Sequence, residues 1–301
     1  MRKIGAILAL AFAAATGGAA PPAPAGRPRG ADAAPAWEFG LTLETVSAVG
    51  LRDGADRGAV IEGGLGVGRI IALPPGFVRL GAAAHRAHYE AEAEFDGALL
   101  GAVEGGYNRV SLSALLVQPG RWTWTALAGA EAAVRDGAAL ADGLSGTGLL
   151  AARTKITHEL SLGIGLLARF QFADDPRVLP VPTVEYRWSP AWTLALERGL
   201  TLRHRPGGAG PTFFFAQVTP DRRRHRLPDG DTVAPGGVFE DRRVAALAGW
   251  EGRPIRGVTA RVFAGLAFAR EWRVADRDGR RVQEADLDPA PVAGLELRAG
   301  F

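Results

Sequence analysis

The sequence contains no cysteine among its 301 residues. The chain can therefore form no disulfide, no thiolate metal site and no lipid-modified N-terminal cysteine. After the first twenty residues it also lacks any run of 18 or more apolar residues, which excludes a membrane-spanning helix there. If the chain is an integral membrane protein, it must close a sheet on itself, because hydrocarbon offers no partner to open strand edges.

An excess of charge of one sign is absent as well. The formal net charge is +3, and it includes Arg2 and Lys3 of the segment that we expect to be removed. No basic face stands out from this nearly neutral background, so we expect no nucleic-acid partner.

The first twenty residues have the three parts of a secretory signal peptide. Arg2 and Lys3 give a positive start, the run from Ile4 to Ala15 is apolar but too short to span a membrane, and Gly18-Ala19-Ala20 offers small residues for cleavage. We therefore expect residues 1–20 to be a signal peptide, 21–36 a flexible tail rich in proline and alanine, and 37–301 one folded domain.

From Trp37 onward the apolar residues recur with a period of two. Between Leu160 and Phe172 the even positions are apolar, whereas the odd positions are mostly small, polar or charged. Such alternation predicts β-strands. Several of these segments alternate for 12 to 16 residues, longer than the strands of a soluble sandwich and long enough to cross a bilayer.

The connections between these segments alternate between short and long, as they do in outer-membrane barrels. The pattern fails once, between Phe172 and Pro220, where one segment does not make a full membrane strand. We therefore predict an all-β, up-and-down antiparallel transmembrane β-barrel of about 12 strands, with 14 if residues 192–204 form two. All seven tryptophans lie near the expected strand ends, as in an aromatic girdle at the membrane surface.

The C-terminus ends on Phe301, and Leu295 and Leu297 share its strand face. This alternating end resembles the C-terminal strand of Gram-negative outer-membrane β-barrels, and the general pattern covers the whole mature chain. The stretch from Leu179 to Trp188 also resembles barrel families without an assigned activity. The resemblance implies an outer-membrane location, contact with membrane lipids including lipopolysaccharide, and insertion by the barrel-assembly machinery, with Leu295, Leu297 and Phe301 as the signal.

Residues that suggest chemistry have simpler explanations here. His85 and His88 would point to opposite faces of a strand, so they cannot share a metal ion. The glycines from Gly64 to Gly68 resemble a phosphate loop, but no helix follows them. The basic run from Arg222 to Arg226 falls in the longest expected connection, where it could bind lipopolysaccharide phosphates or anions, or be a solvated loop.

We therefore predict no catalytic, cofactor or metal site. The function that we expect is a passive pore for small solutes; the alternatives are a structural or interaction barrel with a plugged lumen and, third, a membrane-embedded enzyme that acts on lipids. We expect Arg169, Glu185, Arg187, Glu296 and Arg298 to line the lumen, because each alternates with apolar residues on its strand.

Overall fold

The computed structural model describes residues 36–47, 58–91, 103–172, 174–196, 199–208 and 210–301. The expected signal peptide and all but the last residue of the expected tail lie outside the described residues. No helix in these ranges is long and apolar enough to cross a membrane.

Antiparallel strands make up nearly all of the described chain. The strands are β1 Ala36–Val46, β2 Gly58–Leu73, β3 Gly76–Ala91, β4 Gly105–Gln118, β5 Trp122–Arg135, β6 Leu144–Lys155, β7 Leu160–Phe170, β8 Arg177–Tyr186, β9 Trp192–Leu196, β10 Leu200–His204, β11 Phe213–Arg226, β12 Val238–Ile255, β13 Val258–Ala275, β14 Arg281–Leu287 and β15 Ala290–Gly300. Two short 3-10 helices, Leu140–Gly143 and Pro206–Gly208, lie in connections.

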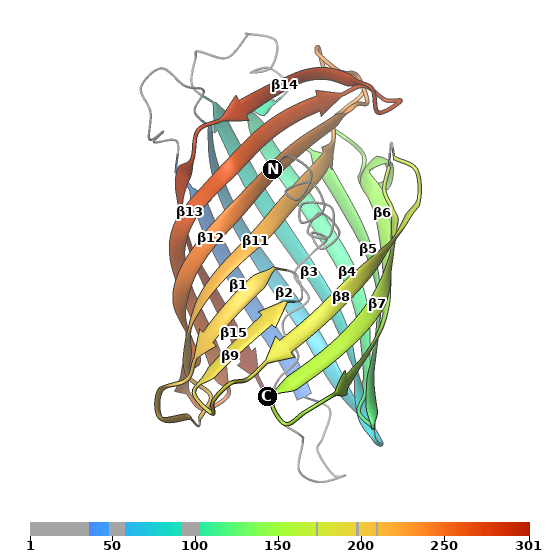
Figure 1. Cartoon of the computed structure of the whole chain (residues 1–301). Coiled ribbons are helices and arrows are strands. Elements are labelled where there is room, and N and C mark those ends of the chain that lie inside the picture. The colour runs from blue at the N-terminus through green and yellow to red at the C-terminus, as the bar shows by residue number, and fades with distance from the viewer. Residues whose placement is uncertain (1–35, 48–57, 92–102, 173, 197–198, 209) are drawn as a thin grey trace, which may run out of the picture.

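The strands close into a barrel (Figure 1). From β1 to β14 each strand pairs with the next along the chain, β15 pairs with β13, and β1 pairs with β15 to complete the ring. β14 and β15 follow one another along the same edge of β13, β14 opposite Arg270–Ala275 and β15 opposite Val258–Ala267. The barrel therefore has 14 strand positions, with β14 as an extra strand on β13.

The prediction of about 12 strands was wrong, and the alternative of 14 is the one that the structure has. The difference lies in residues 192–204, which form the two strands β9 and β10. Each has only five residues, too few to cross a bilayer. The hairpin is half the length of its neighbours, so its alternation passes for one strand in the sequence.

The alternation correctly predicts which side chains face outward. Ile164 is 64% exposed and Phe170 57%, whereas Leu167 and Arg169 on the opposite face of β7 are buried. Other strands carry exposed leucines on their outward face, such as Leu65, Leu112 and Leu150. The outer surface is thus a broad apolar belt, as contact with lipid requires.

One tryptophan does not belong to the expected girdle. Trp272 is fully buried inside the barrel. Ala269 has a φ of 48°, and the pairing of β12 with β13 shifts register beside it, between Arg242 and Val244. This β-bulge reverses the faces of the following residues of β13, so Trp272 points inward. By contrast, Trp122 and Trp124 at the start of β5 lie on the outer surface, where each is nearly half exposed.

The basic run from Arg222 to Arg226 is not a loop, contrary to the prediction. It forms the outer end of β11 and pairs with β12 from Arg222 opposite Arg242 to Arg226 opposite Val238. Arg226 also pairs with Val134 of β5. Five strands separate β5 from β11 around the wall, so this contact narrows the barrel and sets β6 to β8 apart as a side lobe.

Candidate functional site: the barrel interior

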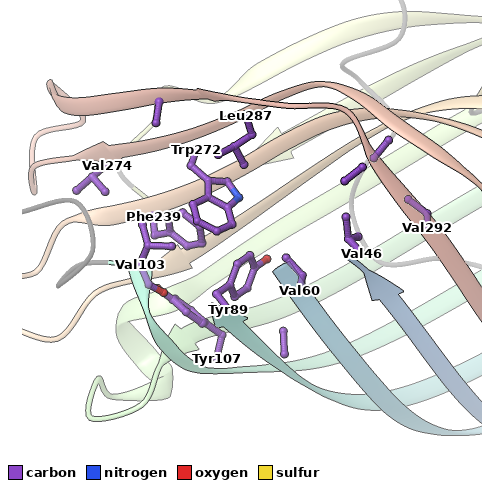
Figure 2. Close-up of a cluster of buried hydrophobic side chains, with 14 of the residues drawn as sticks. Val46, Val60, Tyr89, Val103, Tyr107, Phe239, Trp272, Val274, Leu287 and Val292 are labelled. Carbon is purple, nitrogen blue, oxygen red and sulfur yellow. The ribbon is translucent and has the colours of Figure 1, made fainter. Parts of the chain in front are cut away.

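An aromatic cluster fills the interior near the end that carries the longer connections. Tyr89, Tyr107, Phe239 and Trp272 are at most 1% exposed, and Figure 2 shows their rings gathered between the strands. Tyr89 makes edge contacts with each of the other three, at ring-centre distances of 4.9 to 5.9 Å. His225 of β11 packs against Tyr107 at 4.7 Å. These rings occupy the interior at this end.

Below the aromatic cluster, an ion-pair network crosses the interior. Arg223 of β11 contacts Glu44 of β1 at 2.8 Å, Asp221 at 3.0 Å and Glu62 of β2. Glu62 also pairs with Arg109 of β4, at 2.5 Å. Arg223 reaches carboxylates on β1 and β2, four and five positions away around the ring, so its charge is matched within the lumen, as burial of an ion demands.

Nothing specific in the sequence predicts this network. Glu44, Glu62 and Arg109 do occupy the inward positions of alternating strands, which was the only available signal. Arg223 was misplaced in a loop, and the pairing of β1, β2 and β11 through side chains depends on the curvature of the closed barrel.

At the opposite end, beside the short turns, the interior opens into a vestibule of about 810 Å³. The lobe formed by the ends of β5, β6, β7 and β8 surrounds it. Its charged lining consists of four cations and one carboxylate, namely Arg121, Arg153, Lys155, Arg187 and Glu185. Glu185 accepts hydrogen bonds from Arg153 at 3.0 Å and from Arg187 at 3.1 Å. The vestibule is therefore wet, positive in balance and suited to small anions.

The predicted lumen residues fall in three places. Glu185 and Arg187 line the vestibule. Arg169 is buried and lines a cavity of about 100 Å³ between β7, β8 and β11. Glu296 accepts hydrogen bonds from Arg298 at 2.9 Å and from Arg261 at 3.3 Å. The structure thus brings Glu185 together with Arg187 and Glu296 with Arg298, and it keeps Arg169 apart from both pairs.

The C-terminal residues take part in closing the ring. Leu295 and Leu297 lie opposite Leu43 and Leu41 of β1. The backbone N–H of Phe301 donates to the carbonyl of Trp37 at 2.9 Å, and the Trp37 N–H donates to the carbonyl of Phe301 at 3.1 Å. Phe301 is 81% exposed, and its ring packs edge-on against that of Phe39, with 6.1 Å between the ring centres.

The histidines and the outer rim show no shared site. His85 lies 3.2 Å from Glu62 in the interior, and His88 lies 3.7 Å from Glu90 on the outside, so the predicted opposite faces are confirmed. At the rim, Arg86 donates two hydrogen bonds to Asp136, at 2.7 and 3.2 Å, and holds the pKa of that carboxyl below its ordinary value. Within the described residues, no group of three or more His, Asp or Glu side chains could hold a metal ion.

No family model matches this sequence, and no curated protein matches it either. Solved structures do. The structure of an outer-membrane channel from Pseudomonas putida F1 aligns over 90% of this chain and 97% of its own, with a TM-score of 0.50 and 9% identity.

Two further matches are weaker in geometry. The KdgM porin in complex with disordered oligogalacturonate aligns over 88% of this chain and 99% of its own, with a TM-score of 0.37 and 8% identity. The Pseudomonas putida toluene transporter TodX aligns over 88% and 89%, with a TM-score of 0.41 and 9% identity. At such identities the likeness is one of fold, and the fold of this chain is that of a Gram-negative outer-membrane β-barrel.

Proposed function

We propose that this protein is a passive channel for small solutes in the outer membrane. The observation that carries the proposal is the vestibule of about 810 Å³, an internal space lined by charged side chains inside an apolar belt. A barrel that served only as a membrane anchor would gain nothing from a wet internal space of this size, and small charged solutes are stabilised in it by the surrounding side chains.

The excess of cations in the vestibule determines which ions it favours. Four cationic side chains and one carboxylate, Glu185, line the vestibule, so its lining is positive in balance. Low-dielectric walls strengthen the interaction of this net charge with a passing ion. The channel should therefore prefer anions.

Planar-bilayer recordings of refolded protein under a salt gradient test this function. We expect conductance steps with a reversal potential on the anion side, and a shift toward cations in the double variant Arg153→Gln and Arg187→Gln. The control is Arg86→Gln at the outer rim, which should leave the reversal potential unchanged. Folded protein that shows no conductance would contradict the channel.

A second candidate is a structural or interaction barrel with a plugged lumen. The observation that favours it is the aromatic cluster, in which Tyr89, Phe239 and Trp272 have no exposed surface. The same recordings separate the two functions, because a plugged barrel conducts no ions.

We also propose that the chain is exported with residues 1–20 as a cleaved signal peptide and is inserted by the barrel-assembly machinery. The support for insertion is that Phe301 sits at the β1–β15 seam, where the barrel closes last in the order of the chain. We expect lipopolysaccharide to contact the outer rim and small solutes to be the transported molecules.

A further inference from the structure

Among the described residues, strand pairing in the barrel wall is interrupted between the upper parts of β8 and β11. Within that part of the chain β8 pairs with β9 through Val184, Glu185 and Tyr186. On the other side, β10 pairs with β11 only as far as Val218, opposite Leu200. In the described part of the chain no ladder joins β8 to β11. Residues 177–182 are therefore paired with β7 alone, and residues 220–225 with β12 alone.

Three prolines stand on the two strand edges that border this gap. Pro180 and Pro182 of β8 stay in register with Leu166 and Ile164 of β7. Pro220 of β11 stays in register with β12. Since proline has no N–H and is tolerated where the missing donor faces away from the ladder, the bare edge is the one that faces the gap. The two strands cannot join into a full ladder, so the opening is built into the sequence.

The gap has a lower and an upper boundary. The β9–β10 hairpin, with Leu196 opposite Leu200, closes it below. Above it, Asp174 in the β7–β8 connection pairs with Arg224 at 3.0 Å and lies 3.9 Å from Arg222. The cavity of about 100 Å³ lies in this frame, and Leu179 lines it together with six charged or polar residues from both sides, Arg169, Gln171, Asp174, Asp175, Arg177 and Arg222.

A row of leucines on the inner face of the barrel leads to this opening. Five leucines lie directly opposite one another on consecutive strands, and they are Leu115 of β4, Leu127 of β5, Leu149 of β6, Leu167 of β7 and Leu179 of β8. We call them the leucine row. Its last member, Leu179, lines the cavity at the gap. Lumen faces of outer-membrane barrels are ordinarily polar, so a continuous apolar row is a specific feature.

We propose that the opening between β8 and β11 is a lateral port, through which small apolar solutes pass between the membrane and the lumen along the leucine row. This rests on the proposed channel function and adds the class of solute and the route. The port faces the apolar belt, where Val178 beside it is 64% exposed. The aromatic cluster fills the interior at the end with the longer connections, whereas the port opens toward lipid, which is a route that a polar solute cannot use without leaving water. Strand addition by a second copy is disfavoured, because the prolines remove donors that it would need.

Uptake of N-phenyl-1-naphthylamine by cells that express the full chain tests the port. This apolar dye is held back by an intact lipopolysaccharide layer and fluoresces once it is in the membrane interior. We expect wild-type protein to raise the initial uptake rate above that of cells without it. The chain has no cysteine of its own, so Leu179→Cys can be modified with a bulky maleimide, which should return the rate to that of cells without the protein. Arg277→Cys, in the exposed β13–β14 connection, carries the same adduct as the control.

The leucine row is tested separately with Leu127→Asn and Leu149→Asn combined. A solute methylene group that loses its apolar surroundings changes the partition constant about fourfold. Two polar sites, each affecting one methylene group, should therefore slow uptake about sixteenfold. The control is Thr125→Asn with Thr147→Asn, on the same face of the same strands. A heat-induced mobility shift in gels verifies that all variants are folded.

The outcomes separate the port from the channel. Uptake that responds to neither the adduct nor the asparagines overturns the lateral port, even if the protein conducts ions. Equal uptake with and without the folded wild-type protein overturns the apolar class of solute. Loss of ion conductance with port-dependent dye uptake retained contradicts the ion channel and leaves the lateral port standing.

Discussion

Leu150→Arg should destabilise the barrel by about 2–4 kcal/mol, because it places a charge near the middle of the apolar belt. Leu150 is 54% exposed on the outward face of β6, five residues before Lys155 and six after Leu144. At about 3.3 Å per residue and a tilt of about 40°, these separations correspond to depths of about 13 and 15 Å. The belt of such barrels is about 25 Å tall, so Leu150 lies near its centre.

The matched control is Ala151→Arg, one residue along the same strand and facing the lumen opposite Gly165. A lumen that holds water should accept this charge with less loss. The measurement is equilibrium unfolding by urea of protein folded into phospholipid vesicles, followed by tryptophan fluorescence. A loss of 2–4 kcal/mol corresponds to a folding constant lower by a factor of about 30 to 900. If Ala151→Arg proved the more harmful change, the assignment of the two faces would be refuted.

Other predictions concern the aromatic cluster, assembly and export. Trp272→Ala should lower the free energy of unfolding by about 3–5 kcal/mol and enlarge the conductance step, because it removes a fully buried ring; an unchanged conductance would show that the cluster does not limit the path. Deleting Phe301 should reduce the folded fraction in the outer membrane, seen as a smaller heat-induced mobility shift in gels, and an equal shift would remove this residue from the assembly signal. Mass spectrometry of protein purified from membranes should find a chain that begins near Pro21, and an intact Met1 would contradict cleavage.

The architecture could be predicted from the sequence because lipid imposes a simple rule on alternate residues. Ile164, for example, faces lipid, and the residues on either side of it, Gly163 and Gly165, are small and face the lumen. Alternation does not specify the length of a strand, so the sequence pattern predicts one strand at 192–204, where the structure has a hairpin of two short strands. It also fails at Ala269, where one extra residue reverses the faces and takes Trp272 inside. Only the backbone geometry shows that reversal.

The interior was harder to predict than the belt. Alternation places Glu62 and Arg109 on the inward face, but it cannot say that Arg223 reaches Glu62 across the ring. The leucine row depends on the register of four successive strand pairs, which the sequence does not specify. Pro180, Pro182 and Pro220 were a usable sign of open edges, and they fall where the alternation of short and long connections fails.

Thermal opening of this barrel should be unevenly distributed around its wall. Opening a seam in a membrane breaks hydrogen bonds that no water replaces, so its free energy rises with the number of paired residues. The β8–β9 seam has three described residue pairs, whereas β2 and β3 share sixteen. Amide protons of Val184 and Tyr186, which face β9, should therefore exchange with solvent long before those of β2, and the native state should fluctuate by detaching the short hairpin while the rest of the wall stays paired.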